Sequence, residues 1–178
     1  FTFLSLDDAK ALEAALTPES RVFLVGAGLI GLKCAEGIAR RVKSVEVADL
    51  ADQVLPSILD REGAARVQSY LESQGVTFYL GDTAAKFAGN TAFLKSGKTL
   101  DFDALVLAVG VRPNVSLVKD AGGKVNRGIV TDGSGLTSLP DVYAAGDCCE
   151  SWDITSGESR VLALLPNAYL QGECAGRS

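Results

Sequence analysis

A glycine-rich turn between a short apolar segment and a helical pattern is the feature that most constrains the fold. Residues 21–25 read RVFLV, which is typical of a buried strand, and GAGLIG follows directly at 26–31. The next segment, LKCAEGIARR, has helical apolar spacing, and SVEVAD at 44–49 predicts a second strand. A strand, a turn, a helix and a strand within about 30 residues predict a βαβ unit of an α/β fold with a parallel sheet.

The glycines of this turn, Gly26, Gly28 and Gly31, have the spacing of a dinucleotide-binding motif. In that motif the first glycine allows a tight turn, the second lets a pyrophosphate approach the backbone, and the third allows close helix packing. Leu29 and Ile30 lie at the helix start, where backbone N–H groups would meet the phosphates. The alternative is a purely structural turn, but the position between a strand and a helix favours nucleotide binding.

An acidic residue ends the second strand of this unit. Asp49 lies near the spacing of about 20 residues expected for the carboxylate that binds the adenine ribose hydroxyls. Its charge would repel the additional phosphate of NADP, and the next residues, LADQVLP, contain no basic cluster, so NAD(H) is favoured. Glu46 is the competing acid on the same strand, and the V-E-V alternation indicates that its side chain faces solvent.

Two helical segments accompany the βαβ unit. Residues 7–16, DDAKALEAAL, predict a short amphipathic helix that stops at Thr17-Pro18. Ser57 and Asp60 resemble a capping box, and the helix that they start is expected to end at Gly75.

Further strands follow this helix. VTFYL at 76–80 predicts a strand, and the segments around Gly89-Asn90 predict three short antiparallel strands in place of a crossover helix. ALVLAV at 104–109 predicts a buried central parallel strand that ends at Gly110. The nicotinamide half of a dinucleotide should cross the sheet at the carboxyl end of such a strand.

A second possible site lies nearer the carboxyl end of the sequence. VYAA at 142–145 predicts a short strand that leads into Gly146 and Asp147. Gly146 would let the backbone approach a cofactor, and the Asp147 carboxylate could accept hydrogen bonds from its hydroxyl groups. The alternative is an aspartate that caps a turn. LPNAYLQGECAGRS predicts the start of a helix, with Pro166 in its first turn.

Composition excludes several kinds of chemistry. The chain has no histidine, so it can form no Ser-His-Asp triad, no imidazole base and no histidine metal ligand, and catalysis must depend on a bound cofactor. Its 4 cysteines lack the spacing of a metal site. The net charge of -5 provides no basic face for nucleic acid. No segment resembles a membrane span or a signal peptide, so we expect a cytoplasmic protein.

Three motifs in order, GAGLIG with Asp49, ALVLAVGVRPN and LPDVYAAGDCCE, resemble the pyridine nucleotide-disulfide oxidoreductase superfamily over nearly the whole chain. The resemblance implies a Rossmann-like NAD(H)-binding domain with a β-meander crossover at 21–113, preceded by an entry helix or linker from the FAD domain at 1–20. It implies a partial FAD-binding domain at 114–178. There, Gly146 and Asp147 would bind the ribityl-phosphate region of FAD, and the helix after Pro166 would direct its N-terminus at the flavin.

The same resemblance implies a function. NADH oxidases, rubredoxin reductases and the flavoprotein part of nitrite reductases belong to this superfamily, so we expect an FAD-dependent NAD(P)H oxidoreductase that passes hydride from NADH to flavin and on to an acceptor protein or small molecule. The resemblance places the motif for the FAD pyrophosphate before residue 1 and an interface domain after residue 178. We therefore expect this chain alone to bind FAD weakly or not at all and to be inactive.

Two rival functions come from other classes. An NAD(H)-sensing module without catalysis is the first, and it would have no use for a Gly-Asp flavin motif. A short-chain dehydrogenase is the second, and it would need a Tyr-x-x-x-Lys pair, which the chain lacks. We predict no catalytic side chain and no metal ligand.

Several other residues have simpler explanations. Disulfide reductases of the family usually place Glu two residues after the third glycine, and the Lys33 found here argues against a role like that of lipoamide dehydrogenase. A solvent-facing Lys33 paired with Glu36 explains this residue equally well. Cys34 lies on the apolar stripe of its helix and is expected in the core. Cys148 and Cys149 are adjacent, an arrangement that forms a disulfide only with strain, so we predict no redox role for them.

Overall fold

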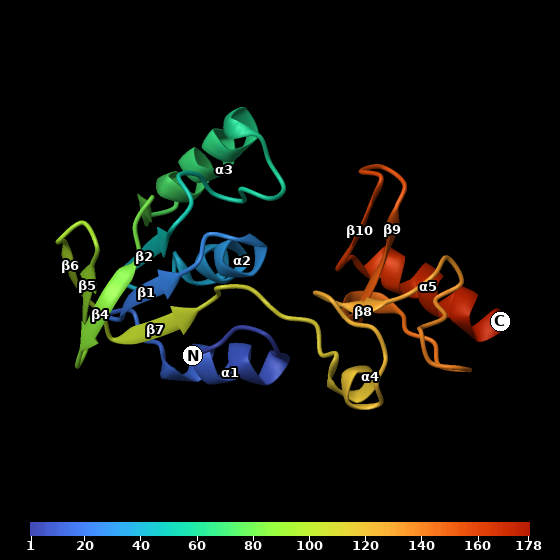
Figure 1. Cartoon of the computed structure of the whole chain (residues 1–178). Helices are drawn as coiled ribbons and strands as arrows, with labels where there is room; N and C mark the ends of the chain where they lie inside the picture. The colour runs from blue at the N-terminus through green and yellow to red at the C-terminus, as the bar shows by residue number, and fades with distance from the viewer. The chain divides into compact units, whose positions relative to one another are not determined.

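A four-stranded parallel sheet forms the centre of residues Phe1–Gly110, the first of two compact units in the computed structural model, which describes residues 1–178 (Figure 1). The two central strands of the sheet are largely buried because most of their side chains are apolar toward both faces, as in parallel sheets generally. In sheet order the four strands are β3 (Val76–Leu80), β2 (Ser44–Asp49), β1 (Arg21–Val25) and β7 (Ala104–Leu107). The predicted α/β fold with a parallel sheet is confirmed.

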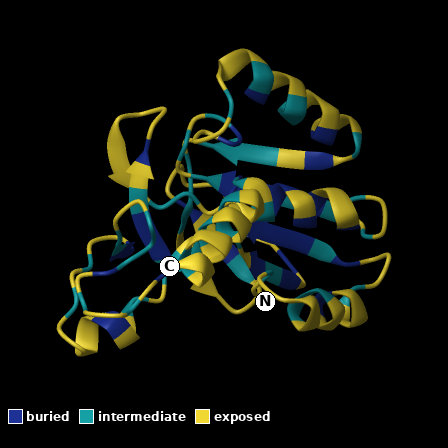
Figure 2. Ribbon diagram, turned by 90° about the vertical axis from the view of Figure 1, so that its right-hand side faces the viewer, coloured by how far each residue is buried: buried dark blue, intermediate teal, exposed yellow.

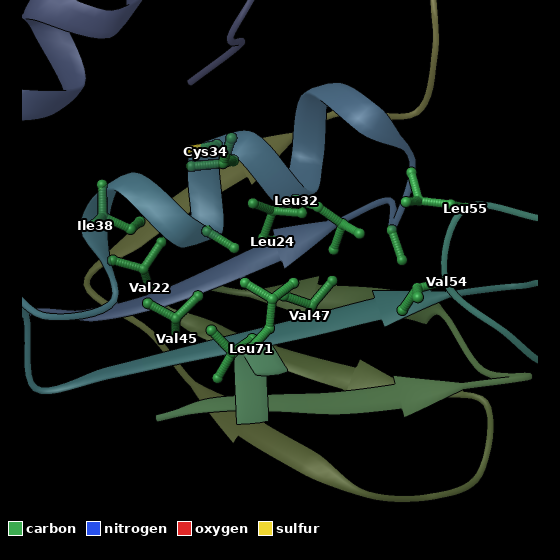
Figure 3. Close-up of a cluster of buried hydrophobic side chains, with 14 of the residues drawn as sticks. Val22, Leu24, Leu32, Cys34, Ile38, Val45, Val47, Val54, Leu55 and Leu71 are labelled. Atoms are coloured by element: carbon green, nitrogen blue, oxygen red, sulfur yellow. The ribbon is translucent and has the colours of Figure 1, made fainter. Parts of the chain in front are cut away.

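Three helices share one hydrophobic core with this sheet. They are α1 (Leu6–Ala15), α2 (Leu29–Ile38) and α3 (Arg61–Ser73). Val22 and Leu24 of β1 belong to the same buried cluster as Leu32, Cys34 and Ile38 of α2 (Figure 3). The expected core position of Cys34 is confirmed. Burial of each large aliphatic side chain contributes about 1.5–3 kcal/mol, so this layer fixes α2 and the turn before it on the sheet.

The opposite face of the parallel sheet is covered by a β-meander. Its strands are β4 (Ala84–Ala88), β5 (Thr91–Leu94) and β6 (Thr99–Asp101), paired antiparallel in the order β4-β5-β6. Phe23 and Ala48, which alternate with the helix-facing residues of β1 and β2, pack against Ala92, Leu94 and Leu100 of the meander. The predicted meander is therefore present.

The second unit, Val111–Ser178, has a smaller core. Its elements are α4 (Ser116–Asp120), β8 (Ile129–Val130), a 3-10 helix (Gly146–Cys148), β9 (Cys149–Asp153), β10 (Glu158–Arg160) and α5 (Leu165–Arg177). The sheet order is β10-β9-β8, in which β8 and β9 are parallel and β9 and β10 form an antiparallel hairpin. Val118, Ile129, Ala144 and Cys149 are buried together, whereas α5 buries none of its residues (Figure 2).

Two predictions of local structure were wrong. α3 begins at Arg61 and not near Ser57, because the Asp60 side chain accepts a hydrogen bond of 2.8 Å from the Gly63 N–H and is itself the N-cap. VYAA forms no strand, and only Tyr143 makes an isolated bridge, because no neighbouring strand pairs with the rest of the segment.

No helix of the structure is both long and apolar enough to cross a bilayer.

The expected domain boundaries and the compact units divide the chain at different residues. The compact units divide after Gly110, and α1 belongs to the first unit, where its Leu12 is only 1% exposed. The assignment of residues 1–20 as an entry segment, of 21–113 to NAD(H) binding and of 114–178 to FAD binding stays a prediction.

Candidate functional site

The first glycine of the turn after β1 occupies a backbone position that excludes other residues. Gly26 has a φ of +113°, a left-handed conformation that favours glycine. A Cβ added to Gly26 would lie 2.3 Å from the carbonyl oxygen of Ala108, the residue after β7. The Gly26 N–H also donates a hydrogen bond of 2.8 Å to Ala48 O in β2. The turn is therefore joined to both neighbouring strands.

The other two glycines differ from each other in their surroundings. A Cβ on Gly31 would lie 2.0 Å from Gly26 O, so only glycine lets α2 pack this closely on the turn. A Cβ on Gly28 would meet no protein atom within 4 Å. Gly28 therefore borders open space at the N-cap of α2, where no side chain caps the first N–H groups. A pyrophosphate fits this position, because it needs close approach to the backbone and free N–H donors.

Leu29 and Ile30 follow in the first turn of α2. Leu29 is exposed and Ile30 is half-buried. Their backbone N–H groups belong to the turn of the helix that has no intrahelical acceptors. The structure thus places all five residues predicted from the motif in one turn.

The carboxylate of Asp49 is half-buried beside this turn. Its Oδ2 accepts a hydrogen bond of 2.6 Å from the Ala27 N–H, and its Oδ1 accepts one of 2.8 Å from the Ala51 N–H. Each oxygen keeps a lone pair, so the carboxylate can still accept hydrogen bonds from two ribose hydroxyls. Asp49 therefore combines a structural role in the turn with the chemistry of a ribose ligand.

Glu46 lies on the other face of β2 from Asp49. Its Oε1 accepts a hydrogen bond of 2.8 Å from the Tyr79 hydroxyl, and it is half-buried. The prediction that Glu46 faces solvent was wrong, because Tyr79 of the adjacent β3 covers it. Burial is the main cause that raises the pKa of Tyr79 above 10.0, and Lys98 lies 4.2 Å from the ring centroid. Glu46 therefore lies on the meander face of β2, and Asp49 lies on the opposite face.

The carboxyl ends of three strands meet at one edge of the parallel sheet. Val25 of β1 is in register with Ala48 of β2 and with Leu107 of β7. The residues that follow these positions, which include Asp49 and Gly110, therefore leave the sheet at the same edge as the glycine turn. Gly110 is exposed and has a φ of +98°. Ligands of open α/β sheets bind at this edge.

In the second unit, the Gly146-Asp147 turn is held by α5. Gly146 has a φ of +80°, and its N–H donates a hydrogen bond of 2.9 Å to Oε1 of Gln171 in α5. Cys149 Sγ lies 3.1 Å from Gly146 O and 3.2 Å from this Gln171 oxygen, either of which can accept its single proton, and Gln171 Nε2 donates a hydrogen bond of 3.1 Å to Ser151 Oγ. Gln171 therefore joins the turn, β9 and α5.

The carboxylate of Asp147 is exposed and accepts no hydrogen bond from the protein. It does not cap the turn through its own side chain, in contrast to Asp153, whose carboxylate accepts hydrogen bonds from Thr155 and Ser156. Asp147 is therefore free to accept hydrogen bonds from a ligand hydroxyl.

The remaining polar and thiol candidates have local partners. Lys33 Nζ lies 2.6 Å from Glu36 Oε2, and this exposed ion pair raises the pKa of Lys33 above 10.5. All four cysteines are free thiols. Burial raises the pKa of Cys34 to about 11, and burial is also the main cause that raises the pKa of Cys149.

Two residues that contact the candidate sites gave no signal in the sequence. Gln171 lies 25 residues from Gly146 in the chain, and the hydrogen bond between them depends on how α5 packs. Leu55 donates its N–H to Ala27 O over 3.0 Å from the loop after β2. A glutamine in a helix, like Gln171, and a leucine before a proline, like Leu55, belong to no sequence motif that predicts these contacts.

Comparison with known proteins adds the family. The family model described as pyridine nucleotide-disulphide oxidoreductase matches residues 1–172. An NADH oxidase of Methanocaldococcus jannaschii is 36% identical over 100% of this chain and 41% of its own length. A ferredoxin reductase from Rhodopseudomonas palustris is 29% identical and superposes with a TM-score of 0.93 over 98% of this chain and 45% of its own.

A third relative was solved with NADH. The water-forming NADH oxidase from Lactobacillus brevis, bound to NADH, is 26% identical and has a TM-score of 0.89 over 99% of this chain and 40% of its own. The chain thus spans less than half the length of each of these relatives. The matched family model and the order of the motifs agree with the fold described above. This chain belongs to the pyridine nucleotide-disulphide oxidoreductase family, whose members use FAD and NAD(H).

Proposed function

We propose that this chain binds NAD(H) through its first unit and contributes to an FAD site through its second, within an oxidoreductase that takes hydride from NADH and passes electrons to a further acceptor. The NAD(H) ligands would be Gly26, Gly28, Leu29, Ile30, Gly31, Asp49 and Gly110, and the FAD ligands Gly146 and Asp147. When bound, NADH supplies the hydride and the flavin accepts it. The residues of this chain bind and orient the two cofactors.

The contrast between Gly28 and Gly31 carries the proposal. Both are glycines of the same turn, yet the space beside Gly31 is filled by Gly26 O at 2.0 Å and the space beside Gly28 is open. A purely structural turn explains the requirement for glycine at Gly26 and Gly31 and leaves the glycine at Gly28 unexplained. A phosphate group that approaches Gly28 explains it.

The position of Asp49 supports NADH over NADPH. A negative charge next to the adenine ribose accepts hydrogen bonds from its 2′-hydroxyl and repels a 2′-phosphate. Leu50 and Ala51, which follow Asp49, provide no compensating positive charge. The Lactobacillus brevis relative described as bound to NADH supports the same choice.

Features of the second unit support a flavin site to which other parts of the protein also contribute. Asp147 is an exposed acceptor without a partner, and Gly146 gives the backbone room beside it. α5 buries none of its residues, and Leu165 and Tyr169 are 84% and 73% exposed. We expect these apolar side chains to be covered when the flavin site is complete.

The relatives support an enzyme rather than the NAD(H)-sensing module considered above, because they are described as oxidases and reductases. The final acceptor of this protein would be a small molecule or an electron-transfer protein. Cytoplasmic localisation stays part of the proposal.

Calorimetric titration with NADH and NADPH tests the nucleotide site. We expect the wild-type chain to bind NADH more tightly than NADPH and Gly28→Ala to weaken NADH binding at least about tenfold, since its methyl group would occupy the phosphate position. Gly37→Ala is the matched control, because a Cβ there also meets no protein atom within 4 Å but lies on the exposed part of α2. Equal NADH binding by the wild type and Gly28→Ala would contradict the proposal.

A further inference from the structure

Leu55 has a backbone conformation that leucine rarely adopts. Its φ is +50°, and it is one of two non-glycine residues with a positive φ, the other being Asp141. Left-handed backbone brings the Cβ of an L-residue too close to its own carbonyl group, so this conformation costs free energy. The following residue is Pro56, which restricts Leu55 further. Such strain persists only where the surrounding structure holds it.

The strained backbone directs the Leu55 N–H to the glycine turn. This N–H donates a hydrogen bond of 3.0 Å to Ala27 O, and Ala27 is the residue between Gly26 and Gly28. The N–H of Ala27 donates to Asp49 Oδ2 over 2.6 Å. Ala27 is therefore held through its N–H by Asp49 and through its carbonyl by Leu55, and it is 0% exposed.

The loop that carries Leu55 is itself fixed. The Leu55 side chain is 8% exposed, and the neighbouring Val54 is 0% exposed. The Leu55 carbonyl accepts hydrogen bonds of 3.0 Å from the N–H groups of Ile58 and of Leu59. A loop fixed in this way can hold the Ala27 carbonyl in one orientation.

We infer that Leu55 is a positioning residue of the nucleotide site: its strained backbone fixes the Ala27 peptide and, through it, the Gly28 backbone that would meet the pyrophosphate. The inference rests on the proposed function, because it concerns the same turn. It goes beyond the motif, which lies entirely at 26–31 and Asp49. Leu55 touches no ligand in this role and acts through Ala27.

Replacement of the Leu55 amide by an ester tests the inference directly. The ester keeps the leucine side chain and removes only the N–H that donates to Ala27 O. The matched control is an ester at Gln74, whose N–H donates over the same distance, 3.0 Å, to Leu71 O at the end of α3 and contacts neither the glycine turn nor the loop of Leu55. We expect the ester at 55 to weaken NADH binding at least about tenfold at a temperature where the chain is folded, and the ester at 74 to change it less than about twofold.

Side-chain variants provide a second measurement if an ester does not fold. Leu55→Val places a β-branched residue at a positive φ, which it tolerates worse than leucine does, and we expect NADH binding to weaken. Leu55→Met keeps an unbranched Cβ and a similar volume, and we expect it to retain wild-type NADH affinity. A merely structural role would lower the melting temperature without changing the dissociation constant of the folded chain.

The outcomes separate this inference from the proposed function. Tight NADH binding by the wild type with unchanged affinity in the ester at 55, or in a folded Leu55→Val, would overturn the positioning role alone. Absence of NADH binding by the wild type would overturn the proposed function and this inference together.

Discussion

The Oδ2 atom of Asp49 accepts a hydrogen bond of 2.6 Å from the backbone N–H of Ala27, inside the turn between Gly26 and Gly28. The proposed ribose ligand is thereby part of the same hydrogen-bonded structure as the proposed phosphate site. Asp49 Oδ1 also accepts a hydrogen bond from the Ala51 N–H. Removal of the carboxylate therefore breaks two hydrogen bonds to the backbone, at Ala27 and at Ala51, as well as the proposed contact with the ribose. A variant that tests the ribose contact alone must therefore keep an acceptor for the Ala27 N–H.

Asp49→Asn and Asp49→Ala should have different effects. We expect Asp49→Asn to keep one oxygen acceptor for the turn and to bind NADPH about as well as NADH, because the negative charge is gone. We expect Asp49→Ala to leave the Ala27 N–H unpaired and to lower stability by about 1–3 kcal/mol. Calorimetric titration with both nucleotides and urea denaturation measure the two effects. A strong NADH preference retained in Asp49→Asn would contradict the assigned role.

Gly31→Ala should lower stability through packing. The new Cβ would lie 2.0 Å from Gly26 O, which is backbone and cannot move away cheaply. We expect a loss of about 1–3 kcal/mol, typical of overpacked sites, and faster hydrogen exchange of β1 amides. Gly37→Ala, in the same helix but in open space, should keep or raise stability. Equal exchange rates of the β1 amides in Gly31→Ala and Gly37→Ala would contradict this prediction, because they would show that the turn accommodates the new Cβ without loss of stability.

Gln171→Leu should destabilise the second unit. The substitution removes the acceptor of the Gly146 N–H, whereas the Cys149 thiol keeps Gly146 O at 3.1 Å, and we expect a loss of about 1–3 kcal/mol from the unpaired N–H. The fluorescence of Trp152, the only tryptophan of the chain, reports unfolding of this unit in urea. Gln171→Glu keeps the acceptor oxygens and should lie closer to the wild type. If both variants unfold at the same urea concentration as the wild type, the hydrogen bonds of Gln171 contribute little to the stability of the second unit.

The stability of the first unit should depend on pH through Asp103. The side chain of Arg21, and then its backbone N–H, lower the pKa of Asp103 from 3.8 to about 2. Because the pKa is lowered by folding, the stabilising contribution is complete above pH 3.8 and is lost as the pH falls through about 2. Melting temperatures measured between these values should fall less steeply for Asp103→Asn than for the wild type. Parallel curves would argue against this assignment.

The four cysteines should react with iodoacetamide in the order of their exposure. Cys174 is exposed and Cys148 is half-buried, so both should be alkylated in the folded chain. Cys34 is 1% exposed and its pKa is raised to about 11 by burial, so it should react only after unfolding. Mass spectrometry of the peptides measures the order. Early reaction of Cys34 would show that α2 opens readily.

The local patterns of the sequence were sufficient to predict the βαβ unit, the meander and the position of the glycine turn. An apolar run, three glycines at fixed spacing and an acid at the end of the next strand all depend on neighbours within one supersecondary unit. The role of Gly31 followed from the same local geometry, since its close neighbour is Gly26 O in the same turn, whereas the close neighbour of Gly26 is Ala108 O after β7. The side on which Asp49 lies followed from the alternation of β2.

Other features depended on contacts between distant parts of the chain, and only the tertiary structure decided them. Ser57 and Asp60 resembled a capping box, but the N–H groups of the residues between them, Ile58 and Leu59, donate to Leu55 O in the loop before α3, and Asp60 is the N-cap. The alternation of β2 predicted that Glu46 faces solvent, because its hydrogen-bond partner, Tyr79, comes from another strand. The contacts of Leu55 with Ala27 and of Gln171 with Gly146 have no local pattern, since each joins two elements whose relative placement is set by the core. The sequence by itself determined the βαβ unit, the meander and the glycine motif, because these depend on neighbours in the chain. The packing of the elements determined which side chains and backbone groups hold the motif in place.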